Sequence, residues 1–219
     1  TAHSGSRRQA RWLLLAALII AGYCGNEYSV RLFAGYDYVF GTVAVLMVVA
    51  LYGTWWGIAA ALGAALQTCL LWGHPYAMVW YVAEAAFVGW CFRRWRTRNL
   101  VIYETFYWAL IGGPLILVIF LFVLRADAQT STAIFLKQWV NGIANAFIAN
   151  ALLAFVPFHR WAACSRRQTE FTVGNMLFNL WIGIVIIPAI ILLAVYGHGE
   201  QRRIENEAIA RVNDHASRQ

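Results

Sequence analysis

Apolar residues in this chain are gathered into seven long blocks, and this arrangement limits the possible folds more than any other feature. A helix needs roughly 20 apolar residues to cross the hydrocarbon core of a bilayer. Open strands would leave backbone groups unsatisfied in lipid, and the blocks lack the alternation of barrel strands. The sequence therefore predicts an all-α integral membrane protein with seven transmembrane helices. The blocks lie at 11–25, 38–53, 55–72, 78–92, 101–124, 132–158 and 172–196.

Composition and charge agree with a membrane protein. Of the 219 residues, 61% are hydrophobic and 12% are charged, whereas a soluble domain has about 45–50% apolar and about 25% charged residues. The net charge of +7 comes mainly from basic clusters between the blocks, which is typical of cytoplasmic loops. We therefore expect no nucleic-acid partner and a cytoplasmic N-terminus. The clusters are Arg7, Arg8 and Arg11; Arg93, Arg94, Arg96 and Arg98; and Arg160, Arg166 and Arg167.

Three regions follow from this topology. Residues 1–10 form a cytoplasmic segment, and residues 11–196 form the seven-helix module, whose first helix is retained because no convincing cleavage site follows it. Residues 197–219 are polar, with apolar residues at every fourth position from Ile204 to Val212, which predicts the first helix of an extracytoplasmic domain. A frayed terminal segment is the alternative. Turns are expected at 53–54, 73–75 and 125–127.

The sequence contains no motif for catalysis. It has no hydrolytic, phosphate-binding or metal-binding motif, and its histidines are not paired at positions i and i+4 within a block. The four cysteines lack metal or redox spacing, so we expect them to fill apolar positions. We expect no enzymatic activity, no cofactor and no metal in this segment.

The most unusual polar residues lie in the sixth block, within FLKQWVNGIANAFIAN. On a helix with 100° per residue, four of them share a single arc of about 100° and one falls outside it. The four are Lys137, Gln138, Asn141 and Asn145, and the one outside is Asn150. Such side chains are costly in lipid, so this polar stripe must face protein or water.

Two compatible interpretations of the polar stripe are open. In the first, Lys137 pairs with Glu84, in the middle of the fourth block, or with a carbonyl group, and the asparagines join helices. In the second, the stripe is one wall of a ligand pocket open to the outer face, with Trp80 and Trp139 supplying aromatic surface.

Other polar residues carry weaker signals. Glu104 and Trp108 are one helical turn apart, and we expect Glu104 near the surface or the inner interface. The first outer loop contains Asn26 and Arg31, and we expect it to be solvated unless it contacts a ligand.

Small residues and breakers indicate how the helices pack. The small residues of 57–66 allow close helix approach, which we expect inside the bundle rather than at a dimer face. Gly112-Gly113-Pro114 and Pro188 permit kinks or breaks beside a cavity.

Four strings resemble a known family in their order and spacing: LYGTWWGIAAALGAALQT, LLWGHPYAMVWYVAEAAFVG, FYWALIGGP and LKQWVNGIANAFIAN. They are similar to the vitamin-uptake-like sensor, a membrane module at the N-terminus of bacterial diguanylate cyclases and sensor histidine kinases. That module in turn resembles the substrate-binding S-components of energy-coupling-factor vitamin transporters. The resemblance covers residues 15–195 and implies a six-helix S-component-like bundle with a seventh helix leading outward. It also implies a following Cache-type domain, another span and a cytoplasmic output domain.

The function implied by this resemblance is ligand sensing in the bacterial inner membrane, within a signalling protein that dimerises. The module would bind a small, partly apolar ligand from the outer side while in contact with membrane lipids. By location, the resemblance points to the polar stripe, Glu84 and the loop around Arg31. With the two tryptophans as aromatic walls, the expected ligand-binding residues are Lys137, Gln138, Asn141, Asn145, Glu84, Trp80, Arg31 and Trp139. The alternatives are an S-component that captures a vitamin or related nutrient, and a bare anchor with lipid in its cavity.

Overall fold

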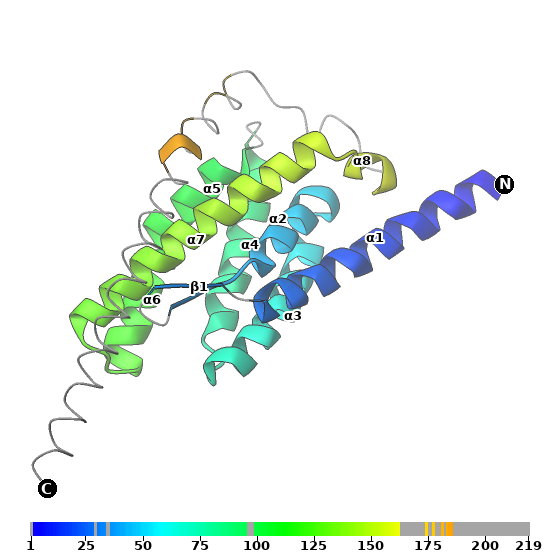
Figure 1. Ribbon diagram of the computed structural model, residues 1–219. Helices are drawn as coiled ribbons and strands as arrows, with labels where there is room; N and C mark the ends of the chain where they lie inside the picture. The colour runs from blue at the N-terminus through cyan, green and yellow to red at the C-terminus, as the bar shows by residue number, and fades with distance from the viewer. Residues whose placement is uncertain are drawn as a thin grey trace, which may run out of the picture.

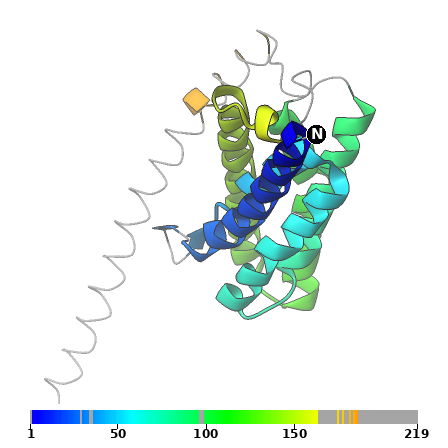
Figure 2. The same ribbon diagram turned by 90° about the vertical axis from the view of Figure 1, so that its right-hand side faces the viewer.

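The computed structural model describes residues 2–28, 30–33, 36–95, 99–162, 174, 177, 181 and 183–185. Most of them are helical, arranged as an up-and-down bundle with one small hairpin (Figure 1 and Figure 2). The helices are α1 (Ala2–Glu27), α2 (Gly41–Tyr52), α3 (Thr54–Trp72), α4 (Ala77–Arg94), α5 (Leu100–Tyr107), α6 (Gly113–Val118), α7 (Ala128–Phe155) and α8 (Phe158–Trp161). The π-helical segments are η1 (Trp108–Gly112) and η2 (Ile119–Val123), and the strands are β1 (Val30–Phe33) and β2 (Tyr36–Tyr38).

The first six apolar blocks correspond to helices, which confirms the mostly helical class. The block that begins at residue 38 becomes helical only at Gly41, because the antiparallel β1–β2 hairpin and two non-helical residues precede α2. Residues 30–33 and 36–38 of the first outer loop form this hairpin. Most of the seventh block, with Pro188, and all of 197–219 lie outside the described residues.

The expected turns are confirmed, and two of them depend on glycine. Gly53 has a φ of 92° and is the single residue between α2 and α3, while Gly73, with a φ of 71°, ends α3. Positive φ costs glycine little because it has no Cβ. Arg125, with a φ of 52°, closes the turn before α7. These tight turns make consecutive helices antiparallel.

Small residues bring α1, α2 and α3 close together, as expected for packing inside the bundle. Ala60, Ala61, Ala64 and Ala65 are all buried. A Cβ built on Gly57 would collide with the Val49 side chain. The row of small residues in α3 is therefore used within this bundle.

The helix from Leu100 to Val123 does not break at its Gly-Gly-Pro sequence. It widens instead into the π-helical segments η1 and η2, on either side of α6, which begins at Gly113. π-Bulges of this kind commonly occur at functional sites. The predicted kink is thus realised as a change of helical pitch, with Pro114 in the first turn of α6.

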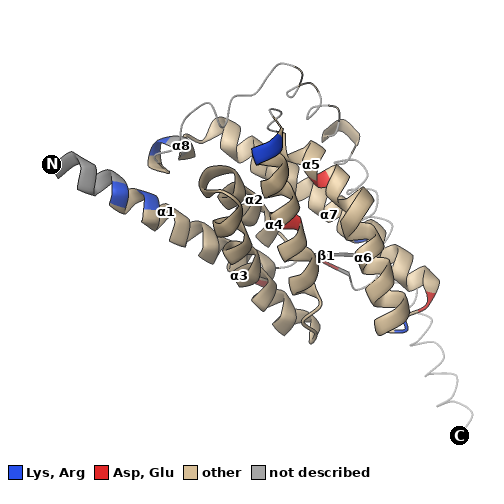
Figure 3. Cartoon of the chain, turned by 180° about the vertical axis from the view of Figure 1, so that it is seen from behind, with Lys and Arg blue, Asp and Glu red and all other residues tan. Residues whose placement is uncertain are grey.

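Basic residues gather at one end of the bundle, as Figure 3 shows for α1, the end of α4, and α8. Among the residues whose side chains are described, these are Arg8, Arg11, Arg93, Arg94 and Arg160. Arg125 and Lys137 lie elsewhere. The alternation of helix direction therefore brings basic clusters that are far apart in sequence to one end.

Two helices in the described part of the chain are long and apolar enough to cross a membrane on their own. They are α3, at Thr54–Trp72, and the continuous helix Leu100–Val123. α2 is apolar but only 12 residues long. α7 has 28 residues, but its polar stripe lowers its mean hydropathy. A seven-span topology is therefore a proposal and is taken up below.

Candidate functional site

The polar stripe of α7 meets the segment Val39–Thr42, which comprises the two residues before α2 and the first two residues of that helix. Asn141 and Asn145 each donate a hydrogen bond from Nδ2 to the carbonyl of Val39, at 3.0 and 2.9 Å. Asn145 also donates to the hydroxyl of Thr42. The C-terminal half of the stripe, Asn141 and Asn145, thus satisfies the non-helical carbonyl of Val39 and joins α7 to the start of α2.

The other side of this segment is held by the end of α1. The Phe40 N–H donates to the Gly25 carbonyl at 2.9 Å, and the Gly41 N–H donates to Asn26 Oδ1 at 2.7 Å. A Cβ on Gly41 would collide with Asn26 Oδ1 and with the backbone of α1. The segment is therefore clamped between α1 and α7, and Gly41 is required by the close approach.

Asn26 was expected in a solvated loop, but it is fully buried at the end of α1. Its Nδ2 lies 2.9 Å from the Ala64 carbonyl and 2.9 Å from the Thr68 hydroxyl, and 3.4 Å from the hydroxyl of Tyr81. One amide therefore ties α1 to α2, α3 and α4. The expectation failed because the first helix runs to Glu27, two residues beyond the predicted block.

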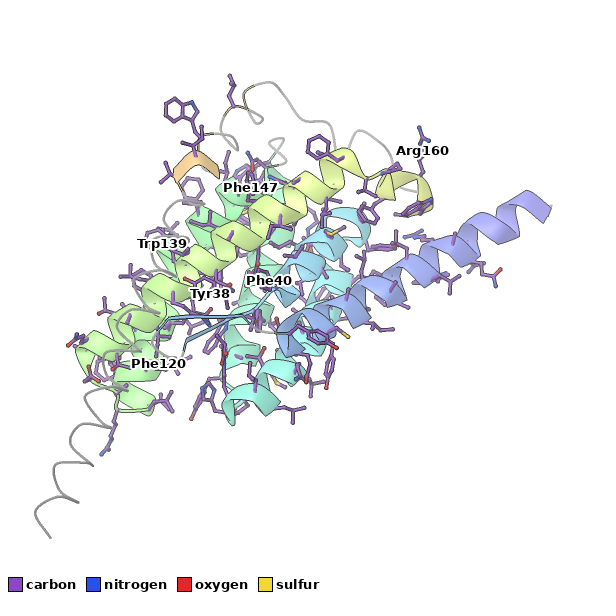
Figure 4. The ribbon with its side chains drawn as sticks, in the orientation of Figure 1. Tyr38, Phe40, Phe120, Trp139, Phe147 and Arg160 are labelled. Carbon is purple, nitrogen blue, oxygen red and sulfur yellow. The ribbon has the colours of Figure 1, made fainter. Side chains whose placement is uncertain are left out.

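A pocket of about 260 Å³ lies at the end of the bundle away from the arginine clusters. It is bordered by the hairpin, the ends of α3 and α4, η2 and the first half of α7. Figure 4 labels Phe120 and Tyr38 below α7, at the end of that helix away from Arg160. The lining residues are Asp37, Trp72, His74, Trp80, Phe120, Ile134, Lys137 and Gln138.

Lys137 is the charged group that α7 contributes to this pocket. It is 4% exposed, and its Nζ lies 5.0 Å from the ring centroid of Trp72 and 5.7 Å from that of Tyr38. The negative charge of Asp37 acts on it across the pocket. Aromatic faces attract a cation by roughly 0.5–2 kcal/mol each, depending on desolvation. The N-terminal half of the stripe, Lys137 and Gln138, therefore lines a cavity.

Glu84 does not pair with Lys137. It is 1% exposed and lies within hydrogen-bonding reach of Glu104, whose Oε1 accepts a 2.8 Å hydrogen bond from Trp108 Nε1. A hydrogen bond between two carboxyl groups requires a proton on one of them. The expectation that Glu104 lies near the surface is wrong, because α5 turns this residue toward α4 and buries it completely.

Gly142 makes the site around Trp108 possible, because a Cβ at this position would collide with the indole Nε1. The indole of Trp108 therefore sits directly against the backbone of α7 while bonding Glu104 on its own helix. The i, i+4 relation of Glu104 and Trp108 predicted this pair, but it gave no sign that Gly142 provides the space.

The remaining predicted residues are placed apart from the pocket. Trp139 packs against Phe135, with ring centroids 5.4 Å apart. The backbone of Arg31 pairs with Asp37 in the hairpin, and its side chain lies outside the described atoms. Asn150 bonds Asn99 at 2.8 Å, where Asn99 caps α5, in agreement with its position outside the arc.

Of the eight predicted site residues, the pocket therefore brings together Trp80, Lys137 and Gln138. Sequence reasoning missed Trp72 and His74, which flank the Gly73 turn, as well as Phe120 and Ile134. Asp37 lay within the first outer loop, yet it was not assigned to the site. Trp72 and His74 had no signal beyond their proximity to a predicted turn, and Phe120 and Ile134 looked like any other apolar residues of their helices.

Comparison of the chain with protein-family models, with curated proteins and with solved structures finds no significant match. Among the described residues, no group of His, Cys, Asp and Glu could hold a metal ion. The site is thus characterised by its own geometry: an aromatic cavity with one buried cation, an acidic group and an amide.

Proposed function

We propose that this chain is a membrane-embedded sensory module that binds a small, partly apolar ligand in the pocket between the hairpin, α3, α4, η2 and α7. The observation that carries the proposal is the buried ammonium of Lys137 inside an aromatic cavity. Ligand sites are typically apolar hollows with a few polar groups that fix orientation. Intramembrane ionisable groups are costly and usually serve function.

Residence in a membrane is supported by the orientation of side chains on the helices. On α3, Leu62, Leu66 and Leu70 are 43%, 53% and 72% exposed, whereas Gln67 and Thr68 of the same helix are buried. A soluble helix orients these residue types in the opposite way. Apolar side chains that point outward and polar side chains that point inward suit a surrounding of lipid.

The proposed orientation has the arginine-rich end in the cytoplasm, following the positive-inside rule. The pocket then opens toward the outer side, near Gly73 and Arg125. Together with the described helices, the apolar block at 172–196 would complete seven spans. The module would lie in a bacterial inner membrane, as its resemblance to vitamin-uptake-like sensors suggests.

Signalling would follow from the number of elements that meet at the pocket. A ligand shifts a conformational equilibrium only if it binds the two states with different affinity. Contacts with α3, α4, η2 and α7 would let one small molecule favour a single arrangement of these helices. The resemblance suggests that the change is passed through a seventh helix to an attached domain.

The experiment is ligand detection on the intact protein in nanodiscs by native mass spectrometry, followed by the same measurement on Lys137→Met and Trp80→Leu. We expect a bound small molecule that both variants lose. Gln129→Ala, an exposed position on α7, is the matched control and should retain it. A bound molecule that survives both substitutions would place the site elsewhere.

A transporter S-component would bind its ligand in the same way, so a second readout separates the two functions. The sensor proposal requires that ligand alter the output of the full-length protein without moving across the membrane. Uptake of the ligand that depends on a coupling ATPase would support the transporter alternative instead. Recovery of phospholipid alone in the pocket would support the bare-anchor alternative.

A further inference from the structure

We infer that the pocket selects a small organic anion, a carboxylate joined to a flat apolar body, with Lys137 as the group that binds the carboxylate. This inference rests on the proposed function, since it names the ligand class of the same pocket. It is carried by three observations: an ammonium without a hydrogen-bond acceptor, an adjacent amide, and aromatic walls.

The ammonium of Lys137 lacks acceptors in the part of the chain that the structure describes. An ammonium has three N–H donors and no acceptor capacity. None of the described residues accepts a hydrogen bond from Lys137, whose recorded partners are the ring faces of Trp72 and Tyr38 and the more distant charge of Asp37. A buried charge that is neither paired nor hydrogen-bonded is unfavourable. The N–H donors of Lys137 are therefore available to acceptors on a bound molecule, beside the carboxyl group of Asp37 that also lines the pocket.

The neighbours of Lys137 favour an anion over a cation as the bound group. Gln138 lines the same cavity and supplies amide donors beside the ammonium. Asp37 also lines the pocket, and its charge acts on Lys137. A carboxylate bound on the Gln138 side of the ammonium, away from Asp37, would take short, charge-assisted hydrogen bonds from Lys137, which are about twice as strong as neutral ones.

The rest of the cavity is suited to a flat apolar body. Trp72 and Trp80 form one wall, with ring centroids 6.2 Å apart and planes inclined by 41°. Phe120, from η2, and Ile134, from α7, complete the lining. Aromatic surfaces prefer offset-stacked or edge-to-face partners. A volume of about 260 Å³ accommodates a fused two-ring acid.

The sequence makes this site directly measurable, because Lys137 is the only lysine in the chain. Reductive methylation of the ε-amine, located by peptide mass spectrometry, therefore reports on this pocket alone. The probes are 2-naphthoate and its neutral isostere 2-naphthamide, applied to the full chain in nanodiscs. The variants are Lys137→Met and, as a control, Arg125→Gln, which removes an exposed cation at the same end of the bundle.

We expect 2-naphthoate to slow methylation of Lys137 roughly tenfold or more at concentrations where 2-naphthamide has little effect, because hydrogen bonds to charged groups are strong. By equilibrium dialysis, Lys137→Met should lose saturable naphthoate binding and Arg125→Gln should keep it. Equal protection by the acid and the amide would overturn the anion inference but leave the proposed pocket intact. Protection by neither probe would also overturn the inference. If neither probe protects Lys137 and native mass spectrometry also detects no bound small molecule, then both the anion inference and the proposed function are wrong.

Discussion

Asn141 and Asn145 allow a quantitative test of the structure, because both donate to the same carbonyl of Val39. Asn141→Ala removes one hydrogen bond, so we expect a loss of about 0.5–1.5 kcal/mol in the free energy of unfolding. Asn145→Ala also removes the donor to Thr42, and we expect a loss of about 1–2 kcal/mol. In either single variant the carbonyl of Val39 keeps one donor.

The double variant should cost more than the sum of the two single variants. No other described residue donates to the Val39 carbonyl, so removing both amides leaves it buried without a hydrogen bond. That adds a desolvation penalty of about 1–3 kcal/mol. We therefore expect a coupling free energy of about 1 kcal/mol or more, with the double variant the less stable.

The assay is reversible unfolding in mixed micelles with increasing sodium dodecyl sulfate, followed by circular dichroism. Gln129→Ala, on an exposed position of the same helix, controls for loss of an amide and should leave the unfolding free energy nearly unchanged. Additivity of the two single variants to within about 0.5 kcal/mol would refute the shared-carbonyl reasoning.

Three further substitutions test other parts of the structure. Gly41→Ala forces a Cβ into the backbone of α1 and should lower the unfolding free energy by at least about 1–3 kcal/mol; an unchanged thermal midpoint would exclude the close approach. Gly142→Ala should displace the Trp108 indole from its hydrogen bond, at a similar cost. Gly142→Ala should also change the near-ultraviolet circular dichroism spectrum, and an unaltered spectrum would contradict the predicted displacement of the Trp108 indole. Asp127 caps α7, and hydrogen bonds from Thr130 hold the pKa of its carboxyl below the usual range. The ionised Asp127 cap therefore contributes its full stability at pH values above the unfolded-state pKa of Asp127. This contribution is lost as the pH falls through the lower pKa that Asp127 has in the folded state. The stability difference between wild type and Asp127→Ala should therefore narrow in acid, and a constant difference would contradict this.

Much of the helical layout could be predicted from the sequence because apolar blocks and turns are local features. The glycines at 53 and 73 marked turns correctly, and the arc of Lys137 to Asn145 identified a face that is buried. Periodicity gives direction around one helix, so it correctly separated Asn150 from that face.

The partners of these residues could not be predicted, because they depend on which distant elements meet. The residues of the polar stripe on α7 have two different roles: Lys137 lines the pocket, whereas Asn145 donates a hydrogen bond to the backbone carbonyl of Val39. Likewise, Glu84 could be identified as buried in the fourth block, but not as the neighbour of Glu104. Its partner depends on how α5 is rotated, and no local pattern records that rotation.

The hydrogen bonds to the Val39 carbonyl, just before α2, also have a consequence for the order of biosynthesis. α2 is 12 residues long, or roughly 18 Å at 1.5 Å per residue, which is well short of a hydrocarbon core of about 30 Å. The carbonyl of Val39 receives its donors only from residues 102 and 106 positions later in the chain. The ribosome delivers α1 to α4 before α7, so the Val39 carbonyl is without both asparagine donors until α7 docks. Docking of α7 is then the step that closes the bundle, and the pocket can form only after it.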